Sequence, residues 1–159
     1  MPEQHIATYL QDHLAGSVVA LELLEHLEKA HADSGLAQFF AALRADITAD
    51  RTELERLMDR LAVSGGRLRS AVAWIGEKAA RLKLRMDDAA DGDFRLLEAV
   101  ELVAIGIEGK RALWLALKAV SVASPKLRGP DYDRLVGRAG EQRERIELVR
   151  IEAARAALG

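Results

Sequence analysis

A single aspartate interrupts the apolar face that is predicted for the second long helical segment. Asp50 lies seven residues from both Leu43 and Leu57, so the three side chains share one face of a helix. An unpaired buried carboxylate is costly, and it therefore needs a cation, a metal ion or a proton as its partner. Asp50 is accordingly the first candidate for chemistry inside the fold.

Three further carboxylates and one histidine could join Asp50 in a metal site. Glu101 and Glu108, seven residues apart, share one face of a later helix. A carboxylate-rich set of ligands suits manganese or iron when one or two histidines also bind. The candidate metal ligands are Asp50, Glu53, Glu101, Glu108 and His13. Taken alone, His13 is more typical of a hydrogen-bonded histidine in a core.

A second interpretation needs no metal, because the last helical segment carries arginines on or beside its apolar face. Arg143 and Arg150 are again seven residues apart. Inward carboxylates that meet guanidinium groups form charge-assisted hydrogen bonds, which satisfy both partners. We expect Asp50 to be buried against Arg143 or Arg150. In this interpretation Glu101 and Glu108 line the same polar layer.

The segment from residue 65 to residue 86 carries a strong local positive charge. It contains six basic residues and one acidic residue, which gives a net charge of +5. Binding of phosphate, acidic lipid or nucleic acid is one interpretation of this charge. A solvated outer face that offsets the acidic first 64 residues is the other. The face that would bind an anion comprises Arg67, Trp74, Lys78, Arg81 and Arg85.

The composition excludes several other classes of site. The chain has no cysteine, which excludes disulfides, thiolate zinc sites and cysteine nucleophiles. A formal charge of −2 and an aromatic content of 4% do not favour nucleic-acid binding by bulk charge or base stacking. Neither a glycine-rich phosphate motif nor a nucleophile elbow occurs. We therefore expect neither enzymatic activity nor a cofactor.

Long helices must position these side chains. Ala, Leu, Arg and Glu dominate, no proline lies between residues 3 and 124, and the alternation typical of strands is absent. The fold class is therefore predicted to be all-α. Gly106 and Gly109 are expected to allow close packing between helices. The pattern predicts helices over about 3–32, 36–63, 67–86, 94–123 and 130–158.

The lengths of helices and loops constrain the connectivity. The loops at 33–35 and 124–129 are short, so each joins two long helices into an antiparallel hairpin. A long helix spans about 42–45 Å, and the shorter helix 67–86 with its loops can return the chain over that length. The second hairpin then starts parallel to the helix over 36–63. Two long hairpins joined by one long crossover resemble the ferritin-like superfamily.

The resemblance covers nearly the whole chain and implies a single domain over residues 1–159, an up-down four-helix bundle with a short crossover helix. Metal-using members carry Glu on two helices and Glu-x-x-His on the other two. All four histidines of this chain (His5, His13, His26 and His31) lie in the first helix, so both Glu-x-x-His motifs are missing.

We therefore expect a non-enzymatic bundle that acts as a structural or interaction module, with a stress response as one setting for it. The alternatives are a di-metal iron or manganese carboxylate protein with a degenerate site, and an anion- or nucleic-acid-binding protein that uses residues 67–86.

The distribution of apolar residues bears on cellular location and on self-association. A basic, apolar leader and an uncharged apolar stretch are both missing, so we expect a cytoplasmic protein without a membrane span. Apolar side chains outside the main stripes predict self-association, most simply as a homodimer. These side chains are Val18, Val19 and Leu23 on the first helix and Leu102, Leu113, Leu117 and Val120 on the helix over 94–123.

Overall fold

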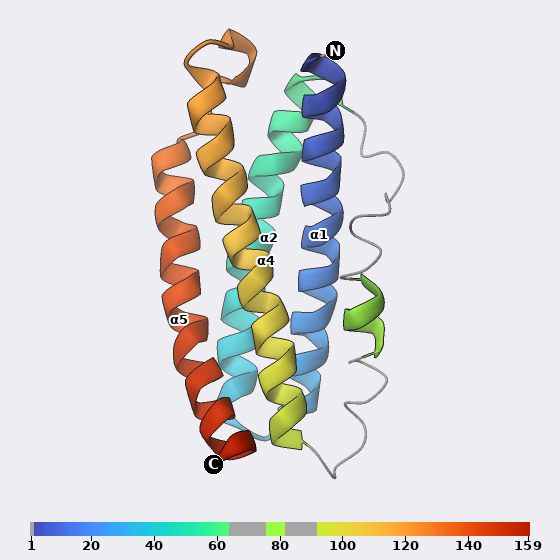
Figure 1. Ribbon diagram of the computed structural model, residues 1–159, viewed down its shortest axis with the longest axis vertical. Helices are drawn as coiled ribbons and strands as arrows, with labels where there is room; N and C mark the ends of the chain where they lie inside the picture. Colours follow the sequence, from blue (N-terminus) through green and yellow to red (C-terminus); the bar gives the residue numbers. More distant parts are fainter. Residues whose placement is uncertain (1, 64–75, 82–91) are drawn as a thin grey trace.

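Helices account for every regular element in the computed structural model, which describes residues 2–63, 76–81 and 92–159. This confirms the all-α prediction for the described residues. Figure 1 shows the helices side by side along one axis. They are α1 (Pro2–Ala30), α2 (Gly35–Arg60), α4 (Gly92–Ser121) and α5 (Tyr132–Leu158), with a short 3-10 helix η2 (Pro125–Leu127) between the last two. Residues 76–81 are also helical and lie beside α1.

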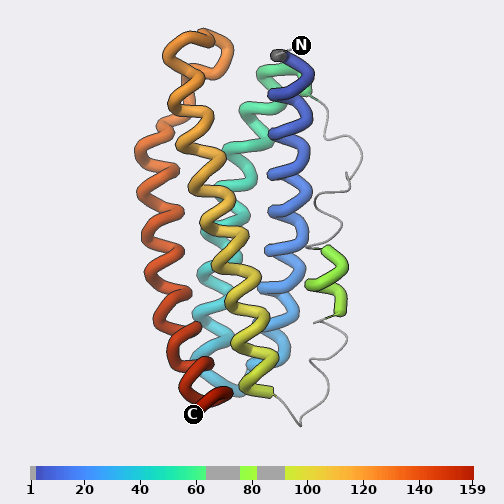
Figure 2. The backbone as a smooth tube through the Cα atoms, in the orientation of Figure 1, coloured from blue at the N-terminus to red at the C-terminus, as the bar shows by residue number. Residues whose placement is uncertain are grey.

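The four long helices form two antiparallel hairpins, α1–α2 and α4–α5. Followed by colour in Figure 2, α1 and α5 run in one direction, and α2 and α4 run in the other. Backbone packing is closest within the hairpins and between α1 and α4. The helices α2 and α5 face each other as the remaining adjacent pair, where side chains make most of the contact. Within the described ranges, no helix combines the length and the hydropathy needed to cross a membrane.

The backbone conformation of Ala62 marks the end of α2. The amide of Ala62 donates to the carbonyl of Asp59, and the amide of Val63 donates to that of Met58 at 2.9 Å. Together with the positive φ of Ala62, 55°, these bonds form a Schellman motif. The helix therefore ends at Arg60, and the prediction that it extends to Val63 was wrong.

The loop between α4 and α5 is closed by hydrogen bonds and by one constrained glycine. Gly129 has a φ of 129°, and the guanidinium of Arg60 occupies the space where a Cβ would lie. The hydroxyl of Tyr132 donates to the carbonyl of Leu127 at 2.5 Å. Asp131 caps α5 by accepting a hydrogen bond from the amide of Arg134 at 3.0 Å. Pro130 thus precedes the helix, whereas the sequence placed it in the first turn.

The core consists of two apolar clusters that follow each other along the bundle. One contains Phe40, Leu43 and Ile47 of α2, and the other contains Leu54 and Leu57 of the same helix. Three of the side chains that were expected to form a self-association surface belong to these clusters and are buried. They are Leu23, Leu113 and Leu117. That part of the prediction was wrong, because α1 and α4 bury a wider stripe than the one read from the sequence.

Candidate functional site

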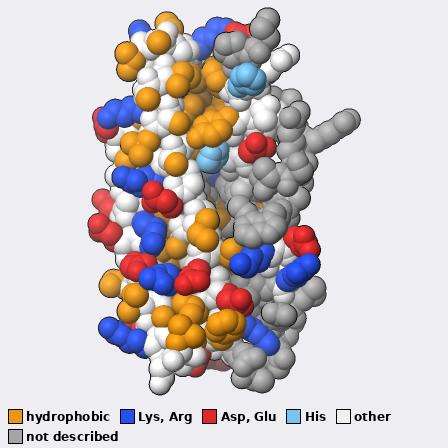
Figure 3. All heavy atoms as spheres, in the orientation of Figure 1, with side chains coloured by type: hydrophobic (Ala, Val, Ile, Leu, Met, Phe, Trp, Pro, Cys, Tyr) orange, Lys and Arg blue, Asp and Glu red, His pale blue; other side chains and the backbone are white. Residues whose placement is uncertain are grey.

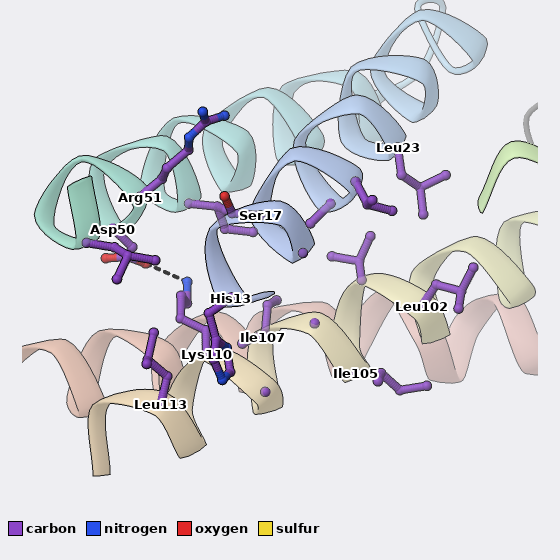
Figure 4. A pocket seen from close by; sticks show the side chains of 18 of the residues that line it. His13, Ser17, Leu23, Asp50, Arg51, Leu102, Ile105, Ile107, Lys110 and Leu113 are labelled. Atoms are coloured by element: carbon purple, nitrogen blue, oxygen red, sulfur yellow. Dashed lines mark hydrogen bonds and ion pairs between the residues drawn. The ribbon is translucent and has the colours of Figure 1, made fainter. Parts of the chain in front are cut away.

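A buried polar cluster separates the two apolar clusters. Asp50 of α2 is 1% exposed, and its Oδ2 accepts hydrogen bonds from Lys110 Nζ at 2.5 Å and Gln142 Nε2 at 2.8 Å. Lys110 of α4 also donates to Oε1 of Gln142, which lies on α5. Arg138 of α5 completes the set, which we call the Asp50 cluster: Asp50, Lys110, Arg138 and Gln142. Figure 4 shows the contact between Asp50 and Lys110.

Arg138 is the guanidinium that reaches Asp50. Its Nη2 lies 3.1 Å from Asp50 Oδ1 and donates to the backbone carbonyl of Asp46 at 3.2 Å. The carboxylate of Asp46 in turn accepts from Arg145 Nη1 at 2.6 Å. The prediction that Asp50 is buried against a guanidinium of the last helix is confirmed, but the arginines it named, Arg143 and Arg150, were wrong.

Arg143 and Arg150 lie on another face of α5 and bind Glu147. Hydrogen bonds from Arg150 and then Arg143 lower the pKa of the Glu147 carboxyl to about 2. Arg150 also reaches Glu101 at 3.3 Å. These ion pairs are solvent-exposed in part, and contacts of this kind add little to stability.

Burial changes the electrostatics of Lys110. Loss of solvent lowers the pKa of its ammonium group, and Arg138 adds to the lowering, whereas Asp50 opposes it through charge and a hydrogen bond. The cation is therefore tolerated at this depth because a carboxylate lies in direct contact with it. Removal of that carboxylate would leave two cations without their partner.

The structure does not bring the candidate metal ligands together. Glu101 and Glu108 are exposed, so their predicted place in the polar layer was wrong. Glu108 pairs with Arg111 at 3.1 Å. Glu53 lies 3.5 Å from both Arg56 and Arg134. In the described part of the chain, no group of three or more His, Asp or Glu side chains could hold a metal ion. The residues present do not fit a di-metal centre.

His13 lies at the edge of the same layer. Its ring meets the ring of Tyr9 edge-on, with 4.6 Å between the centroids. Burial lowers the pKa of His13, and the charge of Asp12 opposes that shift. It makes no hydrogen bond to the residues that the structure describes, so the expected hydrogen-bonded core histidine is not found there.

A cavity of about 360 Å³ opens beside the Asp50 cluster, between α1, α2, α4 and the helical residues 76–81. Its wall is mostly aliphatic, and Figure 4 shows Leu23, Leu102 and Ile105 around the end that lies away from Asp50. A space of this size forfeits many dispersion contacts if it stays empty. Water is a poor occupant, because an apolar wall offers it few hydrogen-bond partners.

Three buried polar atoms in the cavity wall have no hydrogen-bond partner among the described residues, and one of them, Asp50 Oδ1, still forms an ion pair with Arg138. The other two, which have no ion pair either, are Nε1 of Trp114, whose residue is 1% exposed, and Oδ1 of Asp12. A buried donor or acceptor without a partner costs free energy, so each such atom in a native fold calls for an explanation. All three atoms belong to residues that line the same cavity.

Three helical glycines also line the cavity: Gly16, Gly106 and Gly109. A Cβ built at Gly106 would lie 3.9 Å from the Cβ of Ala20, an ordinary contact. At Gly16 and Gly109 no atom of the described chain comes within 4 Å of such a Cβ. The expectation that Gly109 permits close helix packing was therefore wrong, and these glycines keep space open instead.

Most of the predicted anion-binding face cannot be placed. Arg67, Trp74 and Arg85 lie outside the described residues. Of the rest, Arg81 pairs with Glu77 at 2.5 Å on the surface, and Lys78 lines the cavity. The structure thus leaves the anion-binding interpretation untested.

Sequence reasoning missed Lys110 and Gln142, although a signal was present for each. Lys110 continues the buried series Val103 and Ile107 at three-residue and four-residue steps, and Gln142 lies midway between the buried Ala139 and Ile146. Both are polar residues at positions where the helical period places a core side chain.

Comparison of this chain with protein-family profiles, with curated proteins and with solved structures gives no match. The function must therefore be argued from the contacts described above.

Proposed function

We propose that this chain is a non-catalytic helical bundle of the ferritin-like type, which serves as a structural or interaction module. Two features of the fold support the ferritin-like part. The long helices pair as two antiparallel hairpins. The parallel course of α2 and α4 requires the chain to traverse the length of the bundle between them, as in that architecture.

The observation that carries the non-catalytic part is the Asp50 cluster. The only carboxylate among the fully buried side chains of the described residues is already bound by an ammonium, a guanidinium and an amide of the same chain. A divalent cation at this place would face Lys110 and Arg138 at close range in a medium that screens charge weakly. Metal binding at Asp50 would therefore require displacement of two internal cations.

Metal analysis tests this proposal. The protein is produced with excess iron or manganese, and the bound metal is measured by elemental mass spectrometry together with the melting temperature. We expect far less than one metal ion per chain and no change in melting temperature on metal addition. Stoichiometric metal that disappears in Asp50→Ala, but not in the exposed control Glu108→Gln, would overturn the proposal.

The interaction part of the proposal rests on the outer face of α4. Four large apolar side chains of α4, those of Phe94, Ile105, Leu115 and Val120, are between 41% and 60% exposed. Figure 3 shows hydrophobic side chains over this region with charged side chains between them. Such a face suits contact with a second copy of the chain.

Light scattering tests self-association. We expect a mass twice that of the 17.4 kDa chain, and a return toward the single-chain mass in the double variant Ile105→Ser, Leu115→Ser. The matched control Leu148→Ser changes a side chain on α5 that is 72% exposed and should stay dimeric. A single-chain mass for the unmodified protein at high concentration would refute the homodimer but leave the metal result unaffected.

A further inference from the structure

The cavity beside the Asp50 cluster is long and has unlike ends. Its wall extends from Asp12 to Leu23 on α1 and from Leu102 to Trp114 on α4. These spans of eleven and twelve residue-to-residue steps correspond to about 16–18 Å along the bundle. In Figure 4, His13, Asp50 and Lys110 lie at one end, and Leu23, Leu102 and Ile105 lie toward the other. The space is thus shaped for a molecule with one polar end and one aliphatic end.

The unpartnered polar atoms gather at the polar end. Ala20 and Gly106 face each other across α1 and α4, and these helices are antiparallel. Asp12 precedes Ala20 by eight residues and Trp114 follows Gly106 by eight, so both lie at the same level of the bundle. An indole N–H that needs an acceptor and a carboxylate oxygen that needs a donor are therefore placed at one end of one cavity.

Lys110 adds a further donor at this level. An ammonium group has three N–H donors, and Asp50 and Gln142 use two of them. Within the described chain the third N–H has no acceptor, and Lys110 lines the cavity. The polar end therefore offers donors from Trp114 and Lys110 and an acceptor from Asp12.

The charges around the polar end balance without a ligand. Lys110 and Arg138 contact Asp50, and Asp12 adds a second anion to the wall. Arg51 is paired with Glu55, and Lys78, the remaining cation of the wall, also has an interaction partner. A ligand with a charged end would bury a charge that nothing compensates, which is strongly unfavourable. A hydroxyl group carries no charge, and it both accepts and donates a hydrogen bond.

We propose that the cavity between α1, α2 and α4 binds an uncharged aliphatic alcohol. Its chain lies along the aliphatic wall, and its hydroxyl accepts from Trp114 or Lys110 and donates to Asp12. The cavity volume of about 360 Å³ falls within the range of small-molecule sites. This site goes beyond the proposed function and does not depend on the ferritin-like assignment, because it rests on the cavity and on the unpartnered atoms alone.

Fluorescence of Trp114 tests the proposal directly. The chain has two tryptophans, so Trp74→Phe leaves Trp114 as the sole indole reporter. Titration with dodecanol should change the emission saturably, with one molecule bound per chain. Dodecanoate, which has the same chain length and a charged end, should bind at least about tenfold more weakly. Absence of saturable dodecanol binding, or tighter binding of dodecanoate, would overturn the proposal.

A pair of glycine substitutions locates the binding. Gly16→Leu places a side chain in the cavity, at a position where no described atom lies within 4 Å of the added Cβ. This variant should fold and lose dodecanol binding measured by calorimetry. The control Gly137→Leu makes the same change on the exposed side of α5 and should bind as the parent does. Equal binding by both variants would show that the alcohol binds elsewhere.

Calorimetry on Asp12→Ala examines the polar end. The affinity for dodecanol should fall about tenfold, while that for the hydrocarbon decane should stay unchanged, because only the alcohol donates a hydrogen bond. If Gly16→Leu does not fold, Asp12→Ala still decides the matter. Unchanged dodecanol affinity in Asp12→Ala would remove the assigned role of that carboxylate and overturn the site as proposed.

Discussion

Two small residues meet at the α1–α4 interface, whereas the α2–α5 interface is bridged by long polar side chains. Across the first, Ala20 faces Gly106 and the backbones approach closely. Across the second, Arg138 and Arg145 of α5 reach Asp46 and Asp50 of α2, and the backbones are farther apart. Both interfaces join antiparallel helices of the same bundle.

The difference shows two ways to fill the space between helices. Long arginine side chains extend from α5 to α2, where their charged ends meet carboxylates. Small residues bring α1 and α4 together but leave a cavity beside the contact. Long polar side chains thus bridge the wider α2–α5 interface, whereas the cavity lies beside the contact of small residues between α1 and α4.

Removal of the Asp50 carboxylate should have the largest effect. Asp50→Ala leaves Lys110 and Arg138 without their anion, and we expect the free energy of unfolding to fall by about 3–5 kcal/mol. Urea denaturation measures this loss. The double variant Asp50→Leu, Lys110→Met replaces the pair with apolar groups and should recover most of it. A loss below about 1 kcal/mol in Asp50→Ala would show that the cluster is not the polar anchor of the α2–α5 side.

Filling the cavity should act in the opposite direction. Gly16→Leu replaces a poor helix former and buries new aliphatic surface, so we expect the free energy of unfolding to rise by about 1–3 kcal/mol. Gly137→Leu gains the helix propensity alone and should rise by about 1 kcal/mol or less. Thermal unfolding of the two variants separates the contribution of helix propensity from that of the buried aliphatic surface. Destabilisation by Gly16→Leu alone would mean that the space is needed by the protein's own packing.

Loss of one bridge across α2 and α5 should matter less. Arg145 and Asp46 are each about 40% exposed in their side chains, and their atoms lie 2.6 Å apart. Arg145→Gln should lower the free energy of unfolding by about 0.2–1 kcal/mol, since solvent screens an exposed ion pair. A double-mutant cycle with Asp46→Asn measures the coupling, which should shrink further at high salt. A coupling that persists at high salt would place this pair with the buried cluster.

The smallest expected effect is on the pH dependence of stability, and it concerns His13 on the α1 side of the bundle. Burial lowers the pKa of His13, so the unfolded chain takes up the proton first as the pH falls. This contribution to stability is present above the ordinary histidine pKa of about 6.5 and is lost as the pH falls below it. His13→Gln should make the decline between neutral and acidic pH shallower, without removing it, because burial also lowers the pKa of His31.

Arg145→Gln is the matched control for that pH experiment, because arginine stays charged over the whole interval. Its stability curve should run parallel to that of the parent protein. Identical slopes for His13→Gln and the parent would show that His13 is not buried as described.

The helical periodicity of the sequence was sufficient to predict that Asp50 is buried, but not which residues of the Asp50 cluster bind it. Asp50 occupies a core position of α2, and a polar residue there can be read directly from the helical period. The partners depend on the alignment of α5 against α2, which no local pattern fixes. In the structure Arg60, at the end of α2, lies at Gly129 and close to Tyr132, at the start of α5. Asp50 lies ten residues before Arg60, and Gln142 lies ten residues after Tyr132, so this contact sets Asp50 and Gln142 at the same level of the antiparallel pair.

The rotation of α5 explains why the wrong arginines were named. One residue corresponds to about 100° around a helix, so a stripe displaced by one position selects different side chains. The sequence interpretation placed Arg143 on the inward face, whereas Gln142 is buried there. The cavity could not be predicted at all, because a glycine in a helix indicates close packing and open space equally well until the neighbouring helices are placed.

Gly129 has a consequence for how the sequence can change over time. Its backbone φ of 129° is one that residues with a side chain rarely adopt, and the Arg60 guanidinium occupies the place of a Cβ. A library randomised at position 129 and selected for folded protein should return glycine almost alone. At Gly137, where the helix is open to solvent, the same selection should accept many residues. The two glycines of this hairpin would thus be substituted at very different rates. An alignment of distant descendants would retain glycine at position 129 and vary at position 137.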